Sequence, residues 1–72
     1  MRKLLIADFN EDYRIALTAV LKDSYHVLSC RTGTEAWVLL NQEHPDIFIL
    51  DLMLPELDGL TLLERAYASG VH

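Results

Sequence analysis

The fold of this chain is decided by the stretch Ile47-Phe48-Ile49-Leu50-Asp51-Leu52-Met53-Leu54-Pro55-Glu56-Leu57-Asp58-Gly59. Four apolar residues end abruptly in a carboxylate, and a loop punctuated by Pro55 and Gly59 follows. A continuous apolar run bounded by turn signals is typical of a strand buried on both faces of a parallel sheet. In open parallel sheets, functional residues gather beyond the carboxyl ends of the strands. Asp51 occupies that position, where an acid can be a helix cap, a metal ligand or a nucleophile.

The composition predicts one small globular domain. The chain has 72 residues, of which 51% are hydrophobic and 24% charged, so its apolar content is too high for a disordered coil. The net charge of −5 argues against direct nucleic-acid binding, which needs clustered basic residues. The apolar runs are shorter than the roughly 20 residues of a membrane span. The single cysteine, Cys30, cannot form an internal disulfide and is expected to be a small buried strand residue. We expect a soluble, cytoplasmic protein that binds no membrane.

The hydrophobic pattern predicts a strand followed by a helix, three times over. Short links between these units predict right-handed crossovers and a parallel α/β sheet. The first and third strands are the most apolar and should be neighbours, which gives the spatial order second, first, third. The expected strands are residues 3–7, 25–30 and 47–50, and the expected helices are residues 13–22, 34–42 and 60–68.

Apolar spacing also predicts which helix faces point inward. Thr32 or Thr34 is expected to cap the second helix, and Gly70 to follow the third helix in a left-handed conformation. Ile15 and Leu39 should be exposed. The expected inner residues are Tyr13, Ala16, Leu17, Val20 and Leu21 in the first helix, Ala36, Trp37 and Leu40 in the second, and Leu60, Leu63 and Ala66 or Tyr67 in the third.

Two acids close apolar strands, Asp8 after the first and Asp51 after the third. Because the carboxyl ends of parallel strands meet at one sheet edge, both carboxylates should lie within reach of one small cation. Carboxylates with a backbone carbonyl and waters are usual magnesium ligands. Magnesium beside a carboxylate would also allow phosphoryl transfer to Asp, since it offsets the repulsion between two anions. From spacing alone, the alternative that both acids cap helices or lie solvated in loops stays open.

Four segments of the chain match one family in order. They are Leu4-Leu5-Ile6-Ala7-Asp8, Thr32-Gly33-Thr34-Glu35-Ala36-Trp37, Pro45-Asp46-Ile47-Phe48-Ile49-Leu50-Asp51 and Leu52-Met53-Leu54-Pro55-Glu56-Leu57-Asp58-Gly59. With these segments the chain resembles the receiver domain of two-component response regulators, a flavodoxin-like α/β domain phosphorylated by a partner histidine kinase. The resemblance covers the whole chain and makes residues 1–72 the N-terminal part of such a domain, three of its five strand–helix units.

The resemblance implies a role for each residue of the Asp51 site. Asp51 would be the phosphoacceptor, and Asp8 would belong to the acidic cluster that binds Mg²⁺. Met53 stands where the family supplies a backbone carbonyl to the metal, so the implied metal ligands are Asp8, Asp51 and Met53. Pro55 and Gly59 would shape the loop. The chain would accept a phosphoryl group rather than act as an enzyme.

Two departures from the family qualify these roles. Phe9 stands where the family usually has a second acid, which removes one magnesium ligand and predicts impaired metal binding and phosphorylation. The two further strand–helix units of the family are not in the sequence, so the third strand is expected to be an open edge that favours a homodimer or higher assembly.

Two other functions compete with the phosphoacceptor. A pseudo-receiver would use the same fold only for protein–protein interaction, without phosphorylation, and Phe9 favours it. A magnesium-dependent phosphatase with an Asp nucleophile needs a second acid two residues later, where this chain has Met53. The phosphatase is therefore the weakest of the three hypotheses.

Overall fold

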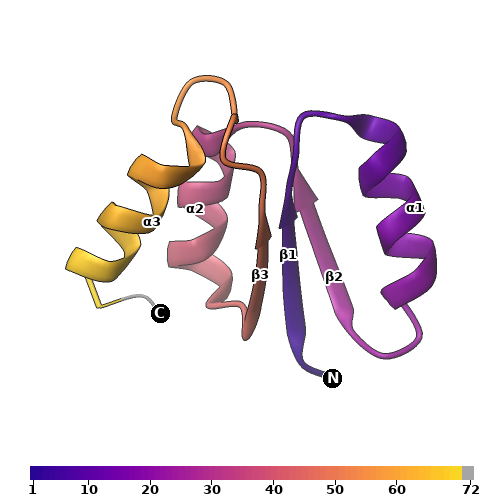
Figure 1. Ribbon diagram of the computed structural model, residues 1–72. Helices are drawn as coiled ribbons and strands as arrows, with labels where there is room; N and C mark the ends of the chain where they lie inside the picture. The colour runs from indigo at the N-terminus through magenta and orange to yellow at the C-terminus, as the bar shows by residue number, and fades with distance from the viewer. Residues whose placement is uncertain (71–72) are drawn as a thin grey trace.

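A computed structural model describes residues 1–70 of the chain, so Val71 and His72 lie outside the described part (Figure 1). Its strands are parallel, in the order β2-β1-β3, and each is followed by a helix. The predicted α/β fold with the strand order second, first, third is confirmed. The elements are β1 (Lys3–Ala7), α1 (Glu11–Leu21), β2 (His26–Cys30), α2 (Gly33–Glu43), β3 (Ile47–Leu50) and α3 (Gly59–Ala68).

The sheet is built around β1. Leu4, Leu5, Ile6 and Ala7 are all buried, because β1 pairs with β2 on one side and with β3 on the other. The four residues of β3 are only half-buried. The prediction that β3 is buried on both faces is therefore wrong. The expectation of an open edge is confirmed within residues 1–70, because β3 pairs only with β1 in the order β2-β1-β3.

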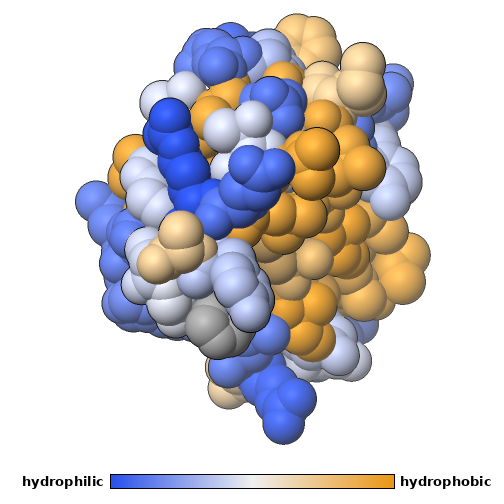
Figure 2. All heavy atoms as spheres, turned by 60° about the vertical axis from the view of Figure 1, so that its left-hand side comes forward, coloured by the Kyte–Doolittle hydropathy of each residue, from blue (hydrophilic) through white to orange (hydrophobic). Residues whose placement is uncertain are grey.

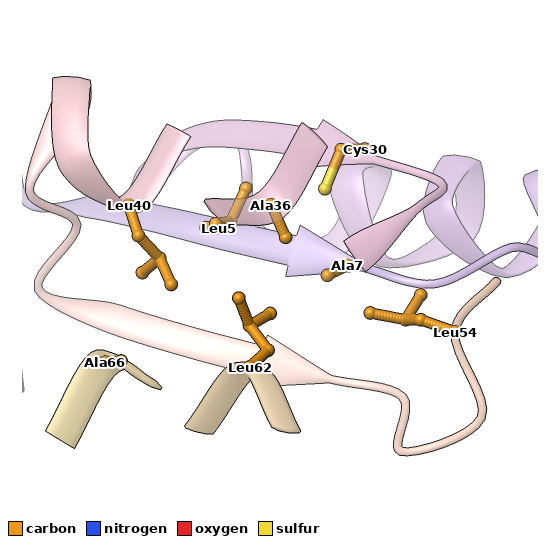
Figure 3. Packing of buried hydrophobic residues seen from close by; sticks show 8 residues of the cluster. All are labelled: Leu5, Ala7, Cys30, Ala36, Leu40, Leu54, Leu62 and Ala66. Carbon is orange, nitrogen blue, oxygen red and sulfur yellow. The ribbon is translucent and has the colours of Figure 1, made fainter. Parts of the chain in front are cut away.

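The main core lies between the sheet and the helices α2 and α3 (Figure 3). It combines side chains of β1, the end of β2, both helices and the loop after β3. Cys30 is buried in this cluster, as predicted, and Phe48 and Leu50 of β3 pack against it. Helix α1 lies on the other side of the sheet (Figure 1). The buried cluster consists of Leu5, Ala7, Cys30, Ala36, Leu40, Leu54, Leu62 and Ala66.

Helix α1 turns a different face to the sheet than its apolar pattern predicts. Leu17 and Leu21 are half-buried as expected, but Tyr13, Ala16 and Val20 are exposed, and Val20 is 75% accessible. Ile15 is exposed, as predicted. Two polar side chains take the inward positions because their hydrogen bonds are satisfied there. Arg14 Nη1 donates to the carbonyl oxygens of Asp8 and Phe9, at 2.7 and 3.1 Å, and the Thr18 hydroxyl donates to the Arg14 carbonyl.

The inner face of α3 also differs from the prediction. Leu60 and Leu63, which were expected inside, are exposed, and Leu62 is buried instead. Of the predicted alternatives Ala66 and Tyr67, Ala66 is the buried residue. The phase of the helix is fixed at its first residue, because Gly59 packs against the backbone of the loop that leads into the helix. Residues three and seven positions later share that face, and these are Leu62 and Ala66.

Helix α2 follows its predicted pattern more closely. Ala36 and Leu40 are buried and Trp37 is half-buried against the core. Leu39 is not exposed as expected, since it too packs against the core. The cap is Thr32 rather than Thr34, because the Thr32 hydroxyl accepts a hydrogen bond from the Glu35 backbone N–H.

The other helix ends are also capped by side chains or by backbone conformation. Asn10 caps α1 and Asp58 caps α3. Gly70 follows α3 with a φ of 83°, the left-handed conformation predicted for it. Within residues 1–70 the helices are too short to cross a membrane.

Candidate functional site at the carboxyl ends of β1 and β3

Asp8 and Asp51 lie at the same edge of the sheet, at the ends of neighbouring strands. They follow Ala7 and Leu50, which are paired in the β1–β3 ladder. The backbone continues this pairing, because the Asp51 N–H donates to the Ala7 carbonyl at 2.9 Å, while the Asp8 N–H donates to the Cys30 carbonyl at 3.1 Å. The structure thus brings together the two acids that the sequence singled out, at the edge where it expected them.

Each of the two carboxylates is oriented by one backbone hydrogen bond. Oδ1 of Asp8 accepts from the Asn10 N–H at 2.9 Å, and Oδ1 of Asp51 accepts from the Met53 N–H at 2.9 Å. Both side chains are half-buried. Within residues 1–70, Oδ2 of either acid has no protein donor in hydrogen-bonding distance. One oxygen of each acid is therefore free to bind a cation or to attack an electrophile.

The start of the loop after Asp51 is held against α3. The Gly59 N–H donates to the Leu52 carbonyl at 3.1 Å. A Cβ atom on Gly59 would lie 2.5 Å from the Asp51 carbonyl oxygen and 2.7 Å from the Leu52 Cα, so a larger residue does not fit without a backbone shift. The predicted role of Gly59 in shaping the loop has this steric basis, and a positive φ plays no part in it.

The middle of the loop is a tight turn with a rare backbone conformation. Glu56 has a φ of 69°, and the Leu57 N–H donates to the Pro55 carbonyl at 2.8 Å. A hydrogen bond between residues two apart around a positive φ defines the strained form of the γ-turn. Leu54 is buried in the core just before this turn, and Asp58 caps α3 just after it. The loop therefore has a fixed path from Asp51 to α3.

Asp58 is committed to this capping role. Its carboxylate accepts hydrogen bonds from the backbone N–H of Thr61 at 2.9 Å and from the Thr61 hydroxyl at 3.0 Å. These bonds, the backbone one first, hold the pKa of the Asp58 carboxyl below its usual value. Asp58 is thus a structural acid of the loop and no candidate for the phosphoacceptor.

Phe9 and Arg14 define the other side of the site. Phe9 follows Asp8, and its side chain is 59% exposed, so no carboxylate occupies this place. The Arg14 guanidinium binds the carbonyl oxygens of Asp8 and Phe9 and thereby holds the loop that carries Asp8. The sequence pattern does not indicate this role of Arg14, because Arg14 lies within the predicted helix without a motif that marks its contact with the preceding loop.

The donor set at this edge is small but suits magnesium. Among residues 1–70, the structure brings together no group of three or more His, Cys, Asp or Glu side chains that could hold a metal ion. Asp8 and Asp51 remain as two carboxylates with free oxygens, and Met53 is an exposed residue of the same loop. Mg²⁺ is commonly bound by only one or two carboxylates, with waters and phosphate oxygens completing its shell. Two carboxylates with free oxygens are therefore within the range of protein ligands with which Mg²⁺ is bound.

Nearly the whole chain matches a known protein family. A family model described as the response regulator receiver domain matches residues 4–70. The chain belongs to this family.

Its curated relatives are longer proteins of bacterial regulation. The chain is 34% identical over 64 residues to the sporulation initiation phosphotransferase F of Bacillus subtilis, and the match covers 88% of this chain and 52% of the relative. It is 40% identical over 72 residues to the virulence transcriptional regulatory protein PhoP of Salmonella typhimurium, and the match covers 99% of this chain and 32% of the relative. The chain spans about half or less of the length of these relatives.

Solved structures show the same fold. The N-terminal domain of an uncharacterized protein from Wolinella succinogenes is 32% identical with a TM-score of 0.93, and the match covers 99% of this chain and 58% of that one. The signal receiver domain of a putative Luxo repressor protein from Vibrio parahaemolyticus is 24% identical with a TM-score of 0.92, covering 97% of this chain and 55% of that one. The second likeness concerns the fold alone.

Proposed function

We propose that this chain is a phosphoacceptor module of two-component signal transduction, in which Asp51 accepts a phosphoryl group from a partner histidine kinase. The observation that carries the proposal is the pairing of Ala7 with Leu50, which sets Asp8 and Asp51 side by side with one free oxygen each. Membership of the receiver family supports it. We place this role in the cytoplasm, where a kinase has access to ATP.

The chemistry requires little from the acceptor beyond position. An oxygen of the Asp51 carboxylate attacks the phosphorus atom of a phosphohistidine, the P–O bond forms as the P–N bond breaks, and the imidazole leaves with the electron pair and takes up a proton. The hydrogen bond from the Met53 N–H to Oδ1 orients the carboxylate for this attack. Because the chain gains the phosphoryl group itself, it acts as an acceptor and not as an enzyme.

Two anions must approach each other in this reaction, and a cation lowers that repulsion. Asp8, Asp51 and the backbone carbonyl of Met53 are the residues proposed to hold Mg²⁺. When bound, Mg²⁺ would neutralise charge on the phosphoryl oxygens. Because Phe9 supplies no third carboxylate, we propose that this chain binds Mg²⁺ more weakly than receivers with an acid at this position, and is phosphorylated more slowly.

A second function is a pseudo-receiver that only binds other proteins. The exposed phenyl ring of Phe9 favours it, because it puts an apolar group where the metal site needs a carboxylate. The two functions differ in their response to a phosphoryl mimic. We expect beryllium fluoride with Mg²⁺ to give a bound fluorine NMR signal in the native chain and none in Asp51→Asn. A folded native chain without that signal would leave the pseudo-receiver as the function.

We also propose that residues 1–72 form the N-terminal part of a receiver domain and associate into a homodimer or larger assembly through β3. The match covers 55% and 58% of the two solved chains, which supports the assignment to part of a domain.

The proposed contact surface lies beside the β3 edge. An open groove of about 1280 Å³ is found there, to which Phe48, Leu50 and Leu63 contribute. Figure 2 shows a broad apolar surface when the α3 side of the molecule is turned forward. Such surfaces in soluble proteins usually mark contacts with another chain.

The assembly can be tested with two charge variants. Leu63→Glu puts a carboxylate at the groove, and Val20→Glu puts one on the exposed face of α1, across the sheet. Size-exclusion chromatography with light scattering should give a dimer or larger species for the native chain and Val20→Glu, and a monomer for Leu63→Glu. A folded native monomer at micromolar concentration would contradict assembly through this surface.

A further inference from the structure

Gly33, the first residue of α2, lies in direct contact with the loop that follows Asp51. A Cβ atom on Gly33 would fall 1.5 Å from the carbonyl oxygen of Leu57, 2.5 Å from its carbonyl carbon and 2.8 Å from its Cβ. Two of these three atoms are backbone, so no side-chain rotation relieves the clash. The contact requires glycine for its lack of a side chain, because the φ of Gly33 is not positive.

A hydrogen bond accompanies this contact. The Gly33 N–H donates to the Pro55 carbonyl at 3.1 Å, and the same oxygen accepts the Leu57 N–H at 2.8 Å, which closes the strained turn at Glu56. The N-terminus of α2 therefore contacts both ends of the turn. A rare conformation such as that of Glu56 persists only where its surroundings fix it, and Gly33 is part of those surroundings.

The loop connects this contact to the Asp51 carboxylate. Met53 lies two residues before Pro55, and its N–H makes the hydrogen bond to Asp51 Oδ1. Gly59 holds the first part of the loop through the Asp51 and Leu52 backbone. The contact at Gly33 holds the later part, at Pro55 and Leu57. The segment that orients Asp51 is thus fixed on both sides, by α3 at its start and by α2 further along the loop.

We propose that Gly33 is a positioning residue for Asp51. Because Gly33 has no side chain, the loop after Asp51 can pack against the N-terminus of α2, and this packing fixes the hydrogen bond between the Met53 N–H and the Asp51 carboxylate. This inference rests on the proposed function where it concerns phosphorylation. The positioning itself is a property of the folded chain and can be measured without a phosphodonor. If Gly33 had only a structural role, its replacement would lower the stability of the chain and leave the Asp51–Met53 hydrogen bond unchanged.

The test compares Gly33→Ala with Gly70→Ala. Gly70 has a φ of 83° and open space around it, so alanine there strains the end of α3 without touching the loop. In folded protein, we expect the amide NMR signal of Met53 to move in Gly33→Ala and to keep its native position in Gly70→Ala. A native Met53 signal in folded Gly33→Ala would overturn the inference, as would an equal displacement in both variants.

A second readout is the rate at which acetyl phosphate with Mg²⁺ labels Asp51. Misplacement of a reacting group by about 1 Å can cost on the order of 100-fold in rate, so we expect a loss of about 10- to 100-fold in Gly33→Ala at saturating donor and metal. Gly70→Ala should keep the native rate. A native rate in Gly33→Ala would overturn the inference. If the native chain is not labelled at all, the proposed phosphoacceptor function fails, and the Met53 signal alone decides the positioning role.

A loop variant decides the question if Gly33→Ala does not fold. Leu57→Gly leaves Gly33 intact and frees the Leu57 peptide to leave its seat on α2. We expect the Met53 signal to move in this variant as well, with a slower labelling of Asp51. Native values of both quantities in Leu57→Gly would show that the seating of the loop does not position Asp51.

Discussion

The carbonyl oxygen of Asp51 lies against the α-carbon of Gly59, where a Cβ atom would approach it to 2.5 Å. The acid proposed to react and the first residue of α3 are therefore packed together through their backbones. This contact explains two features at once. It fixes the exit of the loop from β3, and it sets the helical phase that buries Leu62 and Ala66.

Gly59→Ala should destabilise the chain because its new Cβ atom cannot be accommodated without a backbone shift. Overpacking of this kind costs about 1–3 kcal/mol of the free energy of unfolding. Urea denaturation followed by the fluorescence of Trp37, the one tryptophan of the chain, measures the loss. Leu60→Ala on the exposed side of α3 is the control and should change stability by less than about 0.5 kcal/mol. Equal stability of Gly59→Ala and the native chain would show that the contact carries no strain.

Leu62→Ala and Leu63→Ala test which face of α3 is buried. Leu62 is 0% exposed and Leu63 is 43% exposed. Truncating a buried leucine costs about 2–5 kcal/mol, a large part of the roughly 4–11 kcal/mol expected for a chain of this length. Leu63→Ala should cost less than about 1 kcal/mol. The same urea titration compares the two variants, and a larger loss in Leu63→Ala would contradict the observed helix phase.

The strands show how far sequence patterns reach. The bounds of β1 and β3 match the prediction, because each apolar run ends sharply at an acid. The strand order also follows from the apolar runs, since the most apolar strands become neighbours. The burial of β3 could not be read in the same way. Its apolar run is the same for a strand with two neighbours and for one with a free edge, so the expectation of a free edge came from the family resemblance and not from the run itself.

The helix faces and the loop contacts show where sequence patterns fail. In α1 the pattern placed Tyr13 and Val20 inside, but Arg14 takes an inward position because two carbonyls of the preceding loop accept its hydrogen bonds. In α3 the phase depends on the contact of Gly59 with Asp51, which involves no side chain of the helix. Gly33 is a similar case. Its contact depends on the absence of a side chain and on Leu57, which lies far along the chain, so no local pattern indicates it.

Cys30 should be unreactive in the folded chain. Burial, and to a smaller extent the nearby Glu35 carboxylate, raises the pKa of its thiol from 9.0 to about 11. We expect slow alkylation at pH 8 in buffer and rapid, complete alkylation in denaturing urea, as measured by intact mass. Fast stoichiometric alkylation under native conditions would contradict the burial of this thiol.

The raised pKa of Cys30 also predicts a pH dependence of stability. The protonated thiol is favoured in the folded state, so its contribution is fully present below pH 9 and is lost as the pH rises towards about 11. Other groups titrate in the same range, and Cys30→Ala provides the comparison. The free energy of unfolding should fall more steeply above pH 9 in the native chain than in Cys30→Ala. Parallel curves of the free energy of unfolding against pH would show that the pKa of Cys30 is the same in the folded and the unfolded state.

Phe9→Asp should strengthen Mg²⁺ binding by restoring a third carboxylate beside Asp8 and Asp51. We expect a gain of about tenfold in affinity, which corresponds to about 1.4 kcal/mol, in isothermal titration calorimetry. Phe9→Leu changes the side chain without adding charge and should bind Mg²⁺ like the native chain. Equal Mg²⁺ affinities of Phe9→Asp and Phe9→Leu would show that residue 9 does not contribute to the metal site.

The most direct test of the phosphoacceptor function is the location of a covalent label. The native chain is incubated with Mg²⁺ and acetyl phosphate, digested, and mapped by tandem mass spectrometry, with Asp51→Asn and Asp8→Asn as folded controls. We predict a phosphoryl group on the peptide that contains Asp51, none in Asp51→Asn, and a reduced yield in Asp8→Asn. A folded native chain with no phosphoryl group, or with the same label in Asp51→Asn, would contradict the account.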